Sequence, residues 1–337
     1  MVNGPHDGPV GVFGDPRRTL VMLTVVILVS GIGIGGIAFA LFGDHGGAAS
    51  PQAATGQRSQ PSGGQTETVT ETTVAGPPPC DDPPQANATS VNLTTSGLTM
   101  QTEFSTQCEE GDALTGSAVV LSAAQGTRDF GSAIFDLDSD PIVIPPLGKV
   151  ERTLVYPAGT YWRIPELLRD GTMDVQITNA TQSGDSSSAS GGSSTLTAVR
   201  PANPGHGSLE GTATYALKEL ADYDRGFVGS TLQNYWVPQI SSKKVGLRAD
   251  GIIYTNNDIL RDHLNLRERY GDVRLVWARD WTTFNDPEFW ITVVGVPYYD
   301  GPSANQWCDS HGIDADNCFA KVISSRFGPE GTTMLRN

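Results

Sequence analysis

The chain has 337 residues, a formal net charge of −15 at pH 7 and a hydrophobic content of 38%. This length leaves room for more than one folded domain. The acidic surplus argues against nucleic acid or anionic lipid as a partner, because both require a basic surface. Residues 43–235 hold 22 acidic and 9 basic side chains, so most of the surplus lies there. We interpret the acidity as a contribution to solubility.

An uncharged and largely apolar run occupies residues 19–42. About 20 apolar residues are enough to cross the hydrocarbon core of a bilayer as a helix. Arg17 and Arg18 precede the run and Asp44 follows it, so the positive-inside rule predicts a cytoplasmic tail over residues 1–18. A cleaved signal peptide is the alternative, but its apolar region would span only about 7–15 residues. We therefore expect a single-pass plasma-membrane protein with extracytoplasmic domains.

Two features around this run bear on assembly and reach. Gly31 and Gly35 have the small-xxx-small spacing that lets membrane helices approach closely, so a weak homodimer is one expectation. Residues 43–79 are rich in Pro, Thr, Gly and Ser and contain almost no large apolar side chain. Such a composition cannot offset the loss of chain entropy on folding. We expect a disordered linker, extended by its prolines, that acts as a stalk.

Four cysteines form two local pairs along the chain, Cys80 with Cys108 and Cys308 with Cys318. An extracytoplasmic location favours disulfides, and an even count fits two bridges. Four cysteines allow three connectivities, of which proximity in sequence favours the local one. Zinc is the alternative for clustered cysteines, but no CxxC or CxxH spacing occurs. The sequence predicts two disulfides and no metal.

Residues 80–222 are expected to form an all-β, sandwich-like domain. Short apolar or alternating runs separated by Gly, Pro, Asp and Ser are typical of such domains. The runs cover residues 114–121, 133–137, 142–144, 153–156 and 173–177. A Ser/Gly-rich loop is expected over 182–194, a return to the sheet or a connection at 212–217, and a hinge at 222–229.

The C-terminal region, residues 234–326, is predicted to be an α+β domain with the order βαββαβ. The expected elements are strands at 235–241, 273–281, 289–297 and 319–325, with helices at 256–270 and 302–311. Asn256 or Asn257 is a suitable N-cap, Asp258 favours the first turn, and Gly271 is suited to end the first helix. Residues 327–337 are expected to form a tail.

Three segments of this region resemble the SPOR (sporulation-related repeat) domain, a βαββαβ module that binds peptidoglycan glycan strands in bacterial envelope proteins. They are residues 237–242, 289–298 and 303–307. The region is still more similar to an uncharacterised domain of actinobacterial membrane proteins, some of them fused to serine/threonine kinases, although this chain contains no kinase motif. Ile291 and Val293 depart from the polar residues that SPOR-like domains often place on the open sheet face. We therefore expect that face to be covered, by the connection 243–254.

Five candidate binding residues follow from this resemblance and from the local sequence: Gln239, Ser241, Lys243, Lys244 and Trp281. Sugar rings stack on aromatic faces, and Trp281, which ends its predicted strand beside Arg279 and Asp280, is the best candidate for an exposed platform, although plain packing is the favoured interpretation. The two lysines begin an exposed connection and either meet an anionic wall polymer or remain solvated.

The sequence contains no catalytic constellation, so we predict a protein that is not an enzyme and needs no cofactor. His263 falls on the apolar face of its helix and is interpreted as a core residue. Residues 136–140 resemble the start of a calcium loop but lack its later Gly and Glu, so a solvated turn is favoured. The expected function is binding of cell-wall glycan or an envelope partner; the alternative is a protein-binding ectodomain of a signalling or cell-division assembly.

Overall fold

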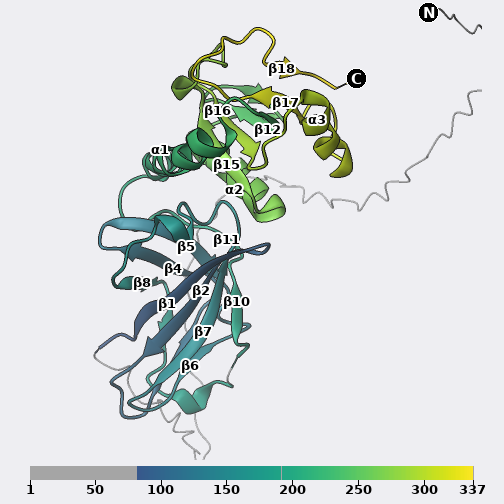
Figure 1. Ribbon diagram of the computed structural model, residues 1–337. Coiled ribbons are helices and arrows are strands. Elements are labelled where there is room, and N and C mark those ends of the chain that lie inside the picture. Colours follow the sequence, from purple (N-terminus) through teal and green to yellow (C-terminus); the bar gives the residue numbers. More distant parts are fainter. Residues whose placement is uncertain (1–81, 191, 337) are drawn as a thin grey trace, which may run out of the picture. The chain divides into compact units, whose positions relative to one another are not determined.

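The computed structural model describes residues 82–190 and 192–336 (Figure 1). The predicted transmembrane helix, the stalk, the glycine pair and Cys80 all lie outside the described residues. Among the helices that are described, none combines the length and the apolar character needed to cross a bilayer.

The first folded region, which we call the β-domain, is made almost entirely of strands, which confirms its all-β class. Its strands are β1 (Gln85–Thr94), β2 (Gly97–Ser105), β3 (Asp112–Thr115), β4 (Val119–Gln125), β5 (Arg128–Phe135), β6 (Ile142–Ile144), β7 (Lys149–Tyr156), β8 (Met173–Thr178), β9 (Thr181–Gln182), β10 (Thr195–Thr197) and β11 (Arg200–Pro201). A 3₁₀ turn at Pro165–Leu167 lies between β7 and β8. The main sheet has the order β10-β7-β2-β1-β8-β4-β5-β11, and β6-β3-β9 form a small second sheet.

The main sheet closes on itself through one continuous segment. β10 pairs in parallel with β7, and β11, three residues later, pairs with β5 at the other end of the sheet. Between them, the amide of Ala198 donates to Val155 O at 2.9 Å and that of Val199 donates to Ile134 O at 2.8 Å. The expected sandwich-like domain therefore has one main sheet, whose two edge strands this segment joins, together with the small second sheet. Alternating side chains fix which residues face inward, but they do not determine which strands become neighbours.

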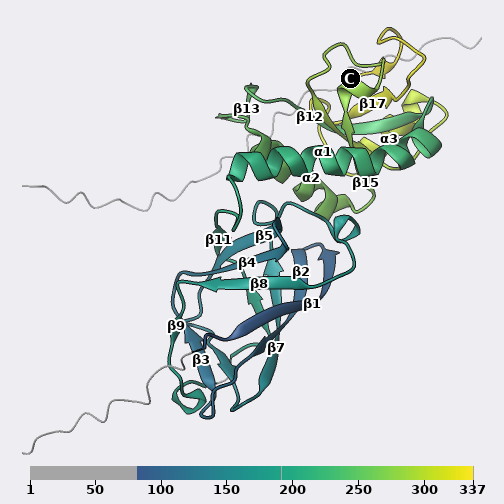
Figure 2. The ribbon, with the colours of Figure 1, turned by 90° about the vertical axis from the view of Figure 1, so that its left-hand side faces the viewer.

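A long helix, α1 (Leu209–Phe227), follows the β-domain and continues into a π-helical turn at Val228–Leu232 (Figure 2). It replaces both the strand or connection expected at 212–217 and the hinge expected at 222–229. Buried residues recur along it at helical spacing: Ala213, Ala216, Leu217, Leu220 and Ala221. The alternation of small and polar residues over a six-residue window was too short to distinguish a strand from one face of this helix.

The C-terminal domain has the predicted βαββαβ order. Its elements are β12 (Trp236–Lys243), the hairpin β13 (Arg248–Ala249) and β14 (Ile252–Ile253), α2 (Asn256–Tyr270), β15 (Val273–Trp277), β16 (Trp290–Val294), α3 (Gly301–Ser310), β17 (Phe319–Val322) and β18 (Thr333–Met334). The sheet order is β15-β16-β12-β17-β18, and all of its pairings are antiparallel. β18 lies in the segment expected to be a tail, so that expectation is corrected.

Local capping signals placed α2 correctly. Its N-cap is Thr255, not Asn256 or Asn257, and the Thr255 hydroxyl and the Asp258 carboxylate form a reciprocal capping box. Gly271 ends the helix with φ of 71°, a conformation that favours glycine. β15, in contrast, ends at Trp277 instead of continuing to Trp281, because the chain turns into a 3₁₀ segment, Ala278–Asp280.

Helices α2 and α3 pack on one side of this sheet, which we call the helix side. Ile240, Val273 and Val294 of three strands form a cluster there with Cys308 of α3. Asp224 of α1 joins the same region: it is 1% exposed, lies 3.2 Å from Arg267 of α2 and accepts a 2.8 Å hydrogen bond from the amide of Leu275. The last turns of α1 are thus tied to the C-terminal domain.

Candidate functional site

The opposite side of the sheet is covered, as expected, but by different segments. Val237, Val276, Ile291 and Val293 point to this side, where they pack against Val228 and Leu232 of the π-helical turn and against Trp281. The prediction that the connection 243–254 covers this side is therefore wrong. The π-helical turn that provides much of the cover belongs to the helix that the sequence analysis did not identify.

Trp281 is 8% exposed and belongs to this core, so the favoured alternative of plain packing holds and the ring is not an exposed aromatic platform. The 3₁₀ turn Ala278–Asp280 comes directly before it and redirects the chain. The Asp280 carboxylate pairs with Arg225 at 2.6 Å, which fixes this turn beside the end of α1. The charged neighbours that suggested exposure are instead the groups that hold the turn while the indole packs inward.

Part of the same side remains open as a cavity of about 240 Å³, which we call the sheet-face cleft. Its apolar lining consists of the half-buried rings of Phe284, Phe289 and Phe319 together with Ile291. Its polar lining consists of Gln239, Ser242, Thr283, Asn285, Asp286, Lys321 and Thr333. Gln239, one of the predicted binding residues, is 6% exposed and lies in this lining.

Lys321 is the most unusual residue of the cleft. It is 5% exposed, and its Nζ donates to the hydroxyls of Thr332 and Thr333 at 3.0 and 2.9 Å. No carboxylate of the described residues lies within ion-pairing distance of it. Burial therefore lowers the pKa of Lys321 to about 8. The ammonium also lies 5.3 Å from the centre of the Phe284 ring.

The two predicted lysines are both engaged with acidic partners. Lys244 lies 2.7 Å from Asp286 at the edge of the sheet-face cleft and 5.1 Å from the Phe289 ring. This contact raises the pKa of Lys244 and lowers that of Asp286, so both stay charged. Lys243 lies 2.8 Å from Asp250 in a different place, over the ring of Tyr254.

Ser241 and Lys243 line a second cavity of about 480 Å³, which we call the edge groove. The Ser241 hydroxyl donates to Asp262 at 2.6 Å, and burial raises the pKa of that carboxyl. Gln239 also reaches this groove. The five predicted residues are therefore divided: Gln239 lines the sheet-face cleft, Lys244 pairs with its lining residue Asp286, Ser241 and Lys243 line the edge groove, and Trp281 belongs to the core.

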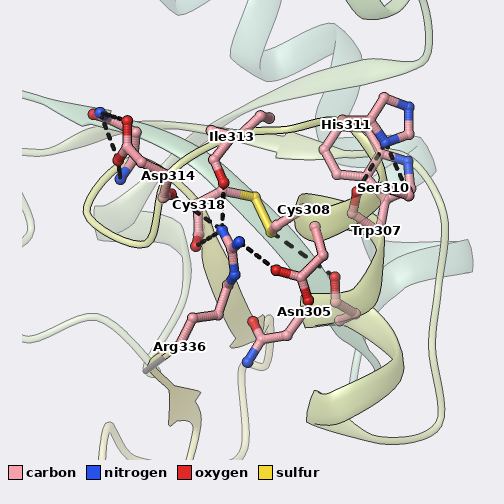
Figure 3. Close-up of polar contacts among 12 residues, drawn as sticks. Asn305, Trp307, Cys308, Ser310, His311, Ile313, Asp314, Cys318 and Arg336 are labelled. Atoms are coloured by element: carbon pink, nitrogen blue, oxygen red, sulfur yellow. Dashed lines mark hydrogen bonds and ion pairs between the residues drawn. A yellow bond between two sulfur atoms is a disulfide. The ribbon is translucent and has the colours of Figure 1, made fainter. Parts of the chain in front are cut away.

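The predicted disulfide between Cys308 and Cys318 is present and joins α3 to the start of β17 (Figure 3). Both cysteines are fully buried, and their Cα atoms are 5.8 Å apart. Arg336, from the expected tail, donates to the carbonyls of Ile313 and Cys318 at 2.7 and 3.3 Å and thus supports this loop. Cys108 is also disulfide-bonded, but its predicted partner Cys80 lies outside the described residues.

His263 and residues 136–140 make the core and turn contacts that the sequence analysis favoured for them. His263 is buried, and its Nδ1 lies 2.9 Å from the Thr292 hydroxyl, as a core histidine should. Burial lowers its pKa well below the ordinary value, so the ring is neutral. In residues 136–140, the Asp136 carboxylate accepts from the amide of Asp138, which is the geometry of a turn. Within the described segments no cluster of three or more metal-binding side chains occurs.

Sequence reasoning missed most of the cleft. Phe284 lies in a connection that carries no periodic pattern, and Phe289, predicted to begin a strand, lies directly before β16, so no local signal indicates the direction of either ring. Lys321 could have been found, because Phe319, Lys321 and Ile323 alternate with Ala320 and Val322 along one strand. A lysine that shares a face with two large apolar residues is a candidate for burial.

Comparison with known proteins identifies no relative of this chain. No protein-family model matches the chain, and neither the curated proteins nor the solved structures contain a match. The SPOR-like resemblance of the C-terminal domain therefore stays a prediction, and the case for a function depends on the sheet-face cleft itself.

Proposed function

We propose that this chain is a single-pass, membrane-anchored and non-enzymatic protein of the cell envelope whose C-terminal domain binds cell-wall glycan in the sheet-face cleft. The observation that carries the proposal is the composition of that cleft, in which Phe284, Phe289 and Phe319 face buried hydrogen-bonding groups of Gln239 and Lys321. The apolar run 19–42 and the stalk 43–79 supply the expected anchor and reach.

The chemistry of a sugar matches both parts of this lining. A pyranose ring has an apolar face that packs on aromatic rings and a rim of hydroxyls that needs hydrogen-bond partners. The Gln239 amide offers two N–H donors and one acceptor oxygen. Ligand sites that are mainly apolar with a few fixed polar groups gain orientation from the polar groups and affinity from the apolar ones.

The location of the cleft agrees with the resemblance. It lies on the side of the sheet away from α2 and α3, which is the side that the SPOR-like resemblance assigns to glycan. The covering segments at 228–232 and 278–289 leave this cleft open on the same side. We therefore infer that glycan contacts a confined cleft instead of a broad open sheet.

The test is co-sedimentation of the full-length chain, purified in a mild detergent, with isolated peptidoglycan. Phe289→Ala removes one aromatic wall and is expected to lower the affinity by about tenfold, in line with the ~1–3 kcal/mol cost of losing a good aromatic contact in a binding site. Tyr299→Ala is the matched control, because Tyr299 is 90% exposed and lies outside the cleft. Equal retention of both variants and the wild type, or no retention of any, would contradict the proposal.

A second candidate function, the protein-binding ectodomain, is favoured by a different surface. Tyr235 and Tyr299 are 36% and 90% exposed, their rings form an edge-to-face pair at 5.6 Å, and Val296 nearby is 37% exposed. Exposed aromatic groups of this kind are frequent in protein interfaces. If Tyr299→Ala abolished a specific cross-link to a membrane protein in cells while peptidoglycan was not bound, this second function would replace the first.

A further inference from the structure

The geometry points to a carboxylate-binding subsite at the Lys321 end of the sheet-face cleft, formed by the Lys321 ammonium and the hydroxyls beside it. This inference deepens the proposed function and rests on it, because it names the group of the wall polymer that the cleft selects. The ligand chemistry is a single carboxylate, which in peptidoglycan comes either from a sugar acid of the glycan or from the free end of a stem peptide.

The first argument is the cost of burying an unpaired charge. A buried ammonium is normally paired with a carboxylate, because desolvation alone disfavours it strongly. Lys321 is 5% exposed and has only the hydroxyls of Thr332 and Thr333 as hydrogen-bond partners within the described part of the chain. An ammonium has three N–H donors, so one remains after these two contacts. An incoming carboxylate would provide the missing partner.

The second argument is an additional polar group without a partner. Thr283 is fully buried and lines the cleft, and its hydroxyl makes no hydrogen bond to any described residue. Leaving a buried hydroxyl unsatisfied lowers stability, and a hydrogen bond to a ligand oxygen would recover this loss. Lys321 and Thr283 come from distant parts of the sequence, yet both reach the same 240 Å³ cavity.

The size and charge of the cleft favour one carboxylate over a larger anion. Pockets for drug-sized ligands hold ~300–1,000 Å³, so a 240 Å³ cleft takes one group of a longer ligand. Asp286 also lies in the lining, 2.7 Å from Lys244, and would repel a doubly charged phosphate more than a singly charged carboxylate. Phosphate sites generally use arginine forks or several backbone N–H groups, and the described lining has no arginine.

The subsite also predicts a pH dependence of binding. The pKa of Lys321 is lowered to about 8, so the free protein loses its positive charge as the pH rises through that value. The other charged groups around the cleft, Asp286 and Lys244, form an ion pair and keep their charges over this range. The affinity for a carboxylate ligand is therefore expected to be constant below about pH 7 and to fall at higher pH, whereas the affinity for an uncharged analogue stays constant.

The experiment measures binding of two probe pairs to the full-length chain by calorimetry. The first pair is a soluble peptidoglycan glycan fragment with free carboxylates and the same fragment converted to amides. The second pair is a stem peptide with a free carboxyl terminus and its terminal amide. We expect one acid to bind about tenfold or more tightly than its amide, and the pair that shows this preference identifies the source of the carboxylate.

Lys321→Met is expected to abolish the preference for the acid, and Lys149→Met is the matched control because Lys149 is an exposed lysine of the β-domain that lies outside the cleft. Equal binding of acid and amide by the wild type overturns the subsite while leaving glycan binding intact, whereas no binding of any probe and no sedimentation with peptidoglycan overturns the proposed function as well. If Lys321→Met does not fold, the wild type decides: an acid preference that is lost between pH 7 and 9 supports the subsite, and a preference unchanged over that range contradicts it.

Discussion

The two sides of the C-terminal sheet bury charge in opposite ways. On the helix side, Arg267 lies 3.2 Å from Asp224, and this carboxylate also accepts from the amide of Leu275. On the other side, Lys321 is equally buried but contacts only the hydroxyls of Thr332 and Thr333. The first arrangement is internally complete, whereas the second has spare hydrogen-bonding capacity next to a cavity.

This difference separates structure from function within one small domain. A buried charge that has its counterion contributes to the fold, since removing one partner leaves the other uncompensated. A buried charge without a counterion lowers the stability of the fold. Such a charge is more readily explained when it binds a ligand that supplies the missing counterion. Substitutions on one side of the sheet at a time, followed by measurements of stability, test this difference.

The largest expected effect comes from breaking the complete arrangement. Asp224→Ala leaves Arg267 buried without its partner and should lower the free energy of unfolding by about 3–5 kcal/mol. Asp222→Ala, two residues earlier on the same helix, is the control, because its pairs with Lys218 and Arg225 are exposed. That variant should lose less than about 1 kcal/mol. Urea denaturation measures both, and equal losses would show that Asp224 has no special role.

A loss of similar size is expected from the core that closes the other side. Trp281→Ala empties a buried site and should cost about 3–5 kcal/mol of stability. Tyr299→Ala removes an aromatic ring that is 90% exposed and should change stability by no more than about 0.5 kcal/mol. Thermal unfolding of the two variants compares them. A stable Trp281→Ala variant would mean that this indole is not part of the core.

Removal of the disulfide between Cys308 and Cys318 should lower the free energy of unfolding somewhat less than Asp224→Ala or Trp281→Ala does. The bridge between Cys308 and Cys318 closes a span of ten residues, for which loop entropy predicts about 2–3 kcal/mol. The double variant Cys308→Ala/Cys318→Ala should be less stable than the wild type by this amount. Reduction of the Cys308–Cys318 bridge should destabilise the wild type by a similar amount, whereas the variant has no such bridge to lose. If unfolding of the double variant matched that of the oxidised wild type, the bridge would be dispensable for the fold.

The smallest expected effect is that of Lys321→Met, which should relieve a destabilising contribution instead of removing a stabilising one. The folded state lowers the pKa of Lys321 from 10.5 to about 8, so between these pH values the unfolded chain binds more protons than the folded chain. Stability attributable to Lys321 therefore rises with pH over that window and is lowest at neutral pH. Lys321→Met should remove this slope and should not destabilise the protein at pH 7. Melting temperatures of both proteins at pH 7.5 and 10 provide the comparison, and a Lys321→Met variant that melts lower at pH 7.5 would contradict it.

The sequence predicted those features of the fold that depend on residues close together in the chain. The bounds of α2, the glycine that ends it and the Cys308–Cys318 bridge depend on neighbouring residues and were predicted correctly. The closure of the β-domain depends on residues 195–201 reaching both β7 and β5, which no local pattern encodes. Helix α1 was missed because small residues weaken its periodicity.

The candidate site was only partly predictable for the same reason. Gln239 and Lys244 lie on or beside a strand that the sequence predicted, and the structure places Gln239 in the lining of the sheet-face cleft and Lys244 against its lining residue Asp286. The direction of Trp281 depends on a 3₁₀ turn held by Arg225 of a distant helix, so the sequence left both an exposed ring and plain packing open. The positions of the Phe284 and Phe289 rings depend on how their loop packs over the sheet, which no local sequence pattern determines.

Photo-cross-linking of a peptidoglycan glycan fragment to the full-length chain, with the adducts located by mass spectrometry, tests the glycan site most directly. Binding in the sheet-face cleft predicts adducts on residues 283–289 and on residues 239–242, and their loss when unlabelled glycan competes. Adducts confined to the exposed Tyr299 loop or to the edge groove around Asp262, or labelling that unlabelled glycan does not reduce, would contradict it.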